Sequence, residues 1–249
     1  MVYPILMKRS FPTELSYLFG IVAIALGTAL AEKADFGLSM IVAPAYILHL
    51  KISEFLPFFS FGMAEYSLQA VILILLGIMM KGFRISYLFS FITAVVYGFV
   101  LDGFIALVSF VPADSVVIRL VFYAVGMLTS SLGVSFMFHT YLAPEAYELF
   151  VKEGARRFSV DINKFKTGYD SVSCLVAIIL SFTFFGFGHF EGVKLGTVFC
   201  ALFNGSVIGM MSRYLDDKFE FVDKLPYRSA FTSSEEVEIA ASKSGIIEK

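Results

Sequence analysis

Six long apolar stretches, separated by short polar or charged connections, dominate the hydrophobic pattern of the chain. Each is close to the ~20 residues that an α-helix needs to cross about 30 Å of hydrocarbon. The pattern therefore predicts an all-α membrane protein with six transmembrane helices. The predicted spans cover about residues 15–33, 61–80, 84–106, 116–138, 167–188 and 193–213.

Two shorter segments interrupt this pattern, one in each half of the chain. Residues 39–50 are apolar but too few to cross as a helix, which indicates a re-entrant or interfacial segment. Residues 143–160 occupy the corresponding place in the second half and mix charged with aromatic side chains. That mixture is typical of an amphipathic helix lying at the membrane surface.

The two halves also share a glycine pattern. Gly-x5-Leu-Gly begins at Gly20 and begins again at Gly126, which lies 106 residues later. At the same offset, Gly62 matches Gly168. The repeats cover about residues 15–106 and 116–213, with three spans in each. Since three is odd, the second copy must enter the membrane from the opposite side, and such inverted 3+3 repeats recur in small-solute transporters.

Composition agrees with this class of protein. Of 249 residues, 58% are hydrophobic and only 16% are charged, and the mean hydropathy is +0.80. A soluble domain has about 45–50% apolar and about 25% charged residues, so we expect the lipid bilayer to cover this chain. The net charge of −2 gives no sign of a nucleic-acid partner. The two cysteines, Cys174 and Cys200, lack metal-ligand spacing, and we expect no metal, cofactor or disulfide framework.

Basic residues predict the orientation. With the N-terminus inside, fifteen Lys and Arg residues fall on the cytoplasmic side and four on the outer side. We therefore expect a multi-pass protein of a bacterial cytoplasmic (inner) membrane with both termini in the cytoplasm. Residues 1–14 form the cytoplasmic N-terminus, 15–215 the transmembrane domain, and 216–249 a cytoplasmic tail that is largely disordered.

Polar side chains inside the spans are the candidate functional residues, because a central Asp, Lys or Arg costs about 2.5–3.5 kcal/mol on insertion. Glu65 and Gln69 are four residues apart and share one helix face. Asp170, Ser171 and Ser173 lie early in the fifth span, near the repeat position of Glu65. These groups are either interfacial carboxylates in contact with water or paired sites for a proton, a cation or a substrate amine. Burial raises the pKa of a carboxyl group, which suits proton coupling.

Two further groups of polar residues also have both a structural and a functional interpretation. Asn204 lies deep in the last span, where it either hydrogen-bonds across a helix contact or contacts substrate. Glu32, Lys33 and Asp35 end the first span, and they form either a solvated helix end or an outer vestibule.

Several short motifs extend across most of the spans. They are Gly-x-Ala-Leu-Ala (27–31), Lys-Ala-Asp-Phe-Gly (33–37), Ala-Pro-Glu (143–145), Lys-Thr-Gly-Tyr-Asp (166–170) and Leu-Gly-Thr (195–197). Over roughly residues 15–213 the chain resembles the YczE/YyaS/YitT-like group of bacterial integral membrane proteins. The resemblance implies a bacterial inner-membrane location and little about chemistry, because the biochemical activity of most members is unknown.

These observations favour a small-solute transporter (permease), proton- or cation-coupled, whose substrate path lies between two inverted halves. The alternative is a non-transporting membrane scaffold or accessory protein for a biosynthetic or secretory assembly. We do not expect an enzyme, since the sequence contains neither HExxH nor a nucleophile elbow. The pattern leaves open the identity of the solute or ion and whether the chain forms a homo-oligomer.

Overall fold

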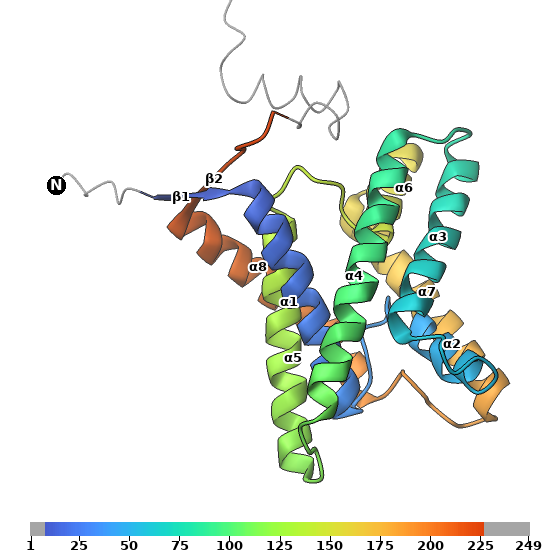
Figure 1. Cartoon of the computed structure of the whole chain (residues 1–249). Coiled ribbons are helices and arrows are strands. Elements are labelled where there is room, and N and C mark those ends of the chain that lie inside the picture. Colours follow the sequence, from blue (N-terminus) through green and yellow to red (C-terminus); the bar gives the residue numbers. More distant parts are fainter. Residues whose placement is uncertain (1–7, 227–249) are drawn as a thin grey trace, which may run out of the picture.

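Six long helices form the body of the protein (Figure 1). The structure is a computed structural model and describes residues 8–226, so most of the predicted disordered tail lies outside the described residues. All six helices are long and apolar enough to cross a membrane, which confirms the predicted spans. They are α1 (Thr13–Ala34), α3 (Phe61–Met79), α4 (Ile85–Ser109), α5 (Val116–Met137), α7 (Ile162–Phe185) and α8 (Leu195–Lys218).

The two short segments form helices α2 (Ala43–Ser53) and α6 (Ala146–Phe158). Each begins beside the middle of a long helix of the other half. The backbone N–H of Ala146 donates to Gln69 at the midpoint of α3, and Ser173 at the midpoint of α7 donates to the carbonyl of Met40. The two short helices then run to opposite ends of the bundle (Figure 1). α6 is amphipathic, as expected, but its apolar side packs on α3, α4 and α7 rather than facing only lipid.

A two-stranded parallel sheet joins the two ends of the described chain. β1 (Arg9–Pro12) pairs with β2 (Phe219–Val222), with Arg9 opposite Phe219. The hydrophobic pattern did not predict this pairing, because four residues are too few to carry a clear alternation. The sheet places the start of α1 and the end of α8 on one face, called the terminal face below, as six crossings require. The opposite face carries the α4–α5 connection.

The most extensive helix contact is the antiparallel crossing of α1 and α5. Gly20 lies against Gly133, and Gly27 lies against Gly126. A Cβ atom added to Gly27 would lie 2.5 Å from the carbonyl oxygen of Gly126, so the two backbones touch. Small residues allow such an approach in a membrane, where van der Waals contact replaces the hydrophobic effect between helices. The repeated glycines of the two halves therefore contact each other.

Most helix contacts occur in matched pairs across the two halves. α1 packs on α4 as α5 packs on α8, α2 packs on α3 as α6 packs on α7, and α6 packs on α3 as α2 packs on α7. This is the pattern that an inverted repeat predicts. Two contacts lack a counterpart: α4 packs on both α3 and α6, whereas α8 makes at most marginal contact with α7 and α2.

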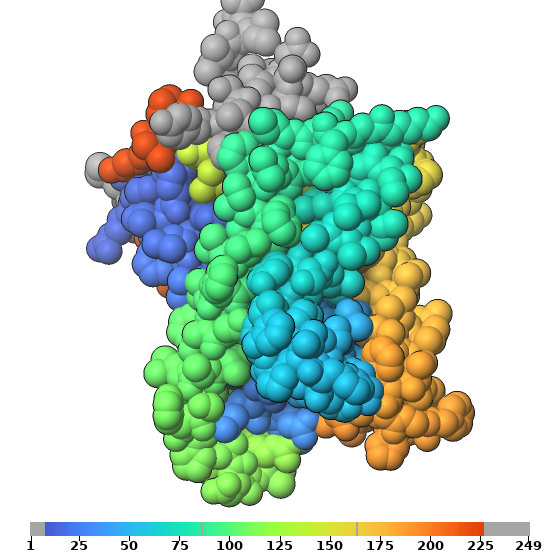
Figure 2. All heavy atoms as spheres, turned by 45° about the vertical axis from the view of Figure 1, so that its right-hand side comes forward, coloured from blue at the N-terminus to red at the C-terminus, as the bar shows by residue number. Residues whose placement is uncertain are grey.

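The surroundings of the glycines show that helix packing differs between the two halves. A Cβ atom on Gly62 of α3 would lie 2.0 Å from the carbonyl oxygen of Gly98 on α4, so these helices are in backbone contact. Figure 2 shows this seam closed, with α2 lying below it beside α7. In the second half, Gly168 of α7 and Gly205 of α8 face open space. α8 thus stands apart from α7 and α2, the counterparts of the helices α3 and α6 that α4 contacts.

The α1–α5 crossing predicts a strong dependence on Gly27. Gly27→Ala places a methyl group against the backbone of α5, and overpacking of this kind typically costs about 1–3 kcal/mol. We expect a lower thermal midpoint in detergent, followed by far-ultraviolet circular dichroism.

Gly103→Ala is the matched control, because Gly103 is also helical and no atom lies within 4 Å of the position that its new methyl group would take. It should leave stability unchanged or raise it by up to about 1 kcal/mol. Equal midpoints for the two variants would contradict the close crossing.

Candidate functional site

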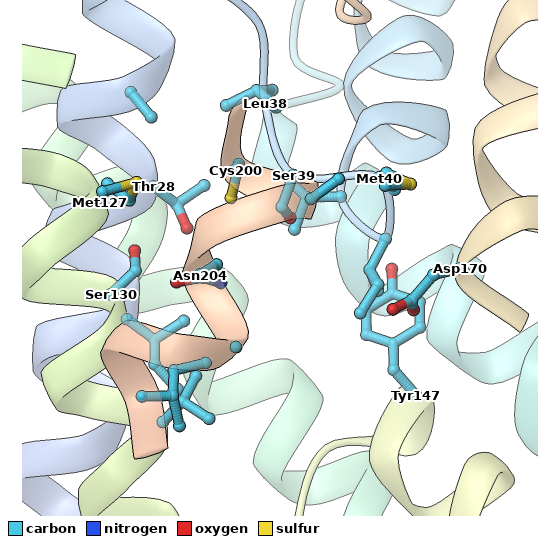
Figure 3. Close-up of a pocket in the computed structure, with 18 of the residues that line it drawn as sticks. Thr28, Leu38, Ser39, Met40, Met127, Ser130, Tyr147, Asp170, Cys200 and Asn204 are labelled. Carbon is cyan, nitrogen blue, oxygen red and sulfur yellow. The ribbon is translucent and has the colours of Figure 1, made fainter. Parts of the chain in front are cut away.

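A cavity of about 360 Å³ occupies the space between α8 and the helices that it does not contact. Its walls come from both halves: α1, the connection before α2, and α4 from the first, and α5 to α8 from the second. Figure 3 shows two polar regions in it, with Thr28, Ser130 and Asn204 in one and Asp170 beside Tyr147 in the other. The volume lies in the range of small-molecule sites, which are about 300–1,000 Å³.

Buried polar side chains at the start of α6 form a network with α3. The Tyr147 hydroxyl donates to Glu65 Oε2 over 2.9 Å, and Gln69 Nε2 donates to Glu145 Oε2 over 3.2 Å. The Gln69 carbonyl oxygen accepts from the N–H of Ala146 at 3.1 Å. We call Glu65, Gln69, Glu145 and Tyr147 the Glu65 network. Glu65 and Gln69 take part together because their spacing of four residues puts both on the face of α3 that meets α6.

The Glu65 network contains two carboxylate oxygens without a partner. The Glu65 side chain is 0% exposed, and its Oε1 accepts no hydrogen bond among the described residues. The same holds for the buried Oε1 of Glu145. A carboxylate that leaves water without full hydrogen bonding or a counter-charge is costly. These oxygens are therefore suited to hold a proton or to receive a positive group.

Glu145 and Glu148, which lie outside the six spanning helices, have raised pKa values. Burial is the main cause for Glu145, and the nearby Glu65 and Glu148 add to it, so that its pKa rises to about 8. Burial also raises the pKa of Glu148, while Lys166 opposes the shift. Since a pKa near 8 lies above neutral pH, Glu145 is mostly protonated at pH 7.

The predicted residues of α7 separate into different positions. Asp170 lines the cavity, and its Oδ1 lies 3.7 Å from Lys166 Nζ one turn earlier. Ser171 is exposed outside the cavity lining and donates to the carbonyl of Thr167 in its own helix. Ser173 holds the connection before α2 through Met40. Of the three, Asp170 is thus the residue placed to meet a solute.

Asn204 lies in the cavity wall on α8 and also joins two helices. Its Oδ1 accepts a hydrogen bond of 2.5 Å from Ser131 of α5. Both alternatives considered for Asn204 are therefore compatible with its place in the fold.

The three residues at the end of α1 have different roles in the fold. Asp35 forms ion pairs with Arg119 at 3.0 Å and with Lys194 at 2.5 Å, which links the end of α1 to the starts of α5 and α8. Lys33 donates instead to the carbonyl of Ser109, and Glu32 lies half-buried one turn before Asp35. The Asp35 ion pairs lie beside Gly37 and Leu38, the buried part of the cavity wall on the opposite face.

Reasoning from sequence overlooked Glu145 and Tyr147 as site residues, because they belong to the segment predicted to lie on the membrane surface. A helix with acidic residues in its first turn and basic residues in its last, as α6 has, is an ordinary charge pattern for a helix dipole. One positional signal was available: at the repeat offset of 106 residues, Ala146 at the start of α6 matches Met40, which lies three residues before α2. Within residues 8–226 no group of three or more His, Cys, Asp or Glu side chains could hold a metal ion.

Comparison with known protein families identifies the family of this chain. A family of unknown function, DUF6198, matches residues 11–213, and the chain belongs to this family. No curated protein and no solved structure is significantly similar to it. The protein is therefore a six-span membrane protein of a family whose function is not known.

The raised pKa of Glu145 predicts how stability depends on pH. The folded protein keeps this proton up to about pH 8, whereas an unfolded glutamate loses it near pH 4.5. The contribution of Glu145 to the free energy of unfolding is therefore fully present below pH 4.5. It is lost as the pH rises to about 8, with a slope of up to about 1.4 kcal/mol per pH unit. The thermal midpoint in detergent between pH 5 and 8 measures it.

Glu145→Gln removes the titrating group and should flatten this slope. Glu54→Gln serves as the control, because Glu54 is exposed and pairs with Lys51 at the far end of α2. A slope that is the same in wild type and in Glu145→Gln would show that Glu145 does not hold the proton.

Proposed function

We propose that the protein is a small-solute transporter in which two inverted halves give alternating access to the cavity beside α8. One observation carries the proposal. The contacts of the two halves match except where α8 stands away from α7 and α2, and the cavity fills that place. A cavity generated by unequal halves of one repeat is what alternating access requires.

The present arrangement corresponds to one of two states. Near the opposite face, buried Gly37 and Leu38 and the ion pairs of Asp35 close the cavity. Its exposed lining includes Phe138 and Lys166, which belong to the ends of α5 and α7 on the terminal face. In the second state α8 would close on α7 as α4 now closes on α3, and α4 would move away.

Proton coupling is part of the proposal. Asp170 lines the cavity from the second half. Glu65 of the first half is not part of the lining, but it accepts a hydrogen bond from the lining residue Tyr147, and Gln69 of the same helix donates to Glu145. Loss of a proton from this group would leave negative charge in a low-dielectric site, which a solute or a change of state must offset. The substrate path then includes Glu65, Gln69, Asp170 and Asn204, with Glu145 added. No catalytic step is assigned.

The proposed location is a bacterial inner membrane with the terminal face in the cytoplasm, in line with the excess of basic residues there. The resemblance to the YczE/YyaS/YitT-like group supports the same location. An accessory or scaffold protein remains the alternative. It would have no need of a cavity that opens to each face in turn.

Cys200 provides a direct test, because it lines the cavity close to the closed opposite face. With Cys174→Ser it becomes the single thiol of the chain. We expect membrane-impermeant methanethiosulfonate reagents to label Cys200 in both right-side-out and inside-out vesicles, since alternating access exposes it to each face. Mass spectrometry of the labelled protein gives the rate from each side.

Further variants test the gate and the coupling. Asp35→Asn should speed labelling from the opposite face several-fold, whereas Lys51→Gln, at a half-buried residue that pairs with Glu54 on that face, should not. The rate should also depend on pH, and this dependence should weaken in Glu65→Gln or Asp170→Asn. Labelling from one side alone under all conditions would favour the scaffold, and a pH dependence kept by both neutral variants would remove proton coupling.

A further inference from the structure

The charged groups that line the cavity are unbalanced. Among the described lining residues, three carboxyl groups (Glu145, Glu148 and Asp170) share the space with one ammonium group, Lys166. Lys166 and Asp170 are a turn apart and form an ion pair. Glu145 and Glu148 have no cationic partner in the cavity, although Lys166 lowers the pKa of Glu148 through space. The site therefore lacks positive charge at the end formed by α6.

The geometry of the acidic end shows where such a charge would sit. Glu145 belongs to the cavity lining, and its Oε1 is buried and accepts no hydrogen bond among the described residues, while its Oε2 accepts one from Gln69. Directly behind it in the Glu65 network, Glu65 is 0% exposed and also has a free carboxylate oxygen. Buried charges persist when they are paired. The free oxygen of Glu145 is thus an acceptor that the fold leaves for a proton or a ligand.

The remaining wall indicates what kind of cation fits. Away from the carboxyl groups the cavity is lined by apolar side chains that include Met127, Val134 and Ile208. A volume of about 360 Å³ exceeds what a bare ion needs, and no described group of three metal-ligating side chains is present. A ligand with an apolar body and one positive nitrogen matches both parts of the wall.

We propose that this cavity binds small organic cations, and that the bound positive charge takes the place of the proton on Glu145. This substrate class rests on the proposed transport function for its physiological meaning, but the binding itself does not. The exchange is balanced: one cation enters, the Glu145 carboxyl group loses one proton to water, and the net charge of the site is unchanged. A transporter built on this exchange moves a proton one way and an organic cation the other.

Other titratable groups around Glu145 set the conditions of the exchange. Glu65 faces it from α3, Tyr97 from α4 and Tyr17 from α1, while Tyr147 and Glu148 flank it on α6. Lys166 and Asp170 lie across the cavity on α7 and largely offset each other. Lys166, the cationic member of this set, is already paired with Asp170. A cationic ligand can therefore take the place of the proton on Glu145.

The test uses benzyltrimethylammonium, whose charge does not change with pH, and isothermal titration calorimetry of the full chain in nanodiscs. Two uncharged or negative compounds with a similar aromatic body, 2-phenylethanol and phenylacetate, are the ligand controls. We expect the cation to bind at least tenfold more tightly than either control at pH 9. With a Glu145 pKa of about 8, its affinity should fall about 100-fold between pH 9 and pH 6.

Variants separate the role of Glu145 from a general effect of charge. Glu145→Gln should bind the cation weakly and with less than about threefold change between the two pH values. Asp170→Asn should weaken binding at both pH values and keep the pH dependence, because the variant removes one acidic group from the cavity wall and leaves Glu145 in place. Glu54→Gln, far from the cavity, should behave as wild type. Size-exclusion profiles show which variants are folded, and the comparison of the cation with its controls in wild type does not depend on any variant.

Two results would overturn the proposal: equal affinities for the cation and its neutral control in wild type, or a full pH dependence in Glu145→Gln. Cys200 labelling keeps this test apart from that of transport. Two-sided labelling without cation binding would leave a transporter with another substrate class. Cation binding with one-sided labelling would leave a cation-binding membrane protein that does not transport.

Discussion

The contact of backbone with backbone between α1 and α5 is the constraint on which the remaining structure depends. In a membrane, an apolar side chain gains little free energy when it exchanges contact with lipid for contact with another helix. Helices therefore associate where small residues bring their backbones together. Gly20, Gly27, Gly126 and Gly133 provide this approach over two turns of each helix. Because α4 is packed on α1 and α8 on α5, the crossing of α1 and α5 holds these two helix pairs together.

A second constraint comes from the carboxyl groups at the centre. The start of α6 lies beside the midpoint of α3, where Gln69 binds both the backbone of Ala146 and the side chain of Glu145. This contact brings Glu145 close to the fully buried Glu65. Two acidic groups in a low dielectric cannot both be ionised without a counter-charge. The same contact that positions α6 therefore brings together the two carboxyl groups on which the proposed exchange of a proton for a cation rests.

The sequence predicted the six spans well, because an apolar run of about 20 residues has few other stable arrangements. It also identified the repeated glycines, although their spacing alone could not show that Gly27 would meet Gly126. The partner of the apolar stripe of α6 could not be predicted, since periodicity does not distinguish lipid from protein. Glu145 was overlooked for this reason. Ser171 was expected in the substrate path, but it follows Asp170 in α7 and therefore points to a different side of the helix, outside the cavity lining.

The position of α8 relative to α7, compared with that of α4 relative to α3, tests alternating access most directly. Spin labels at exposed Val172 and Val198 report on α7 and α8, and labels at Val71 and Val96 report on α3 and α4. Pulsed electron paramagnetic resonance in liposomes should give two distances for each pair. As pH changes, a gain in the long distance of one pair should accompany a gain in the short distance of the other. A single distance for each pair, unchanged with pH and with benzyltrimethylammonium, would contradict the exchange of states between the two halves.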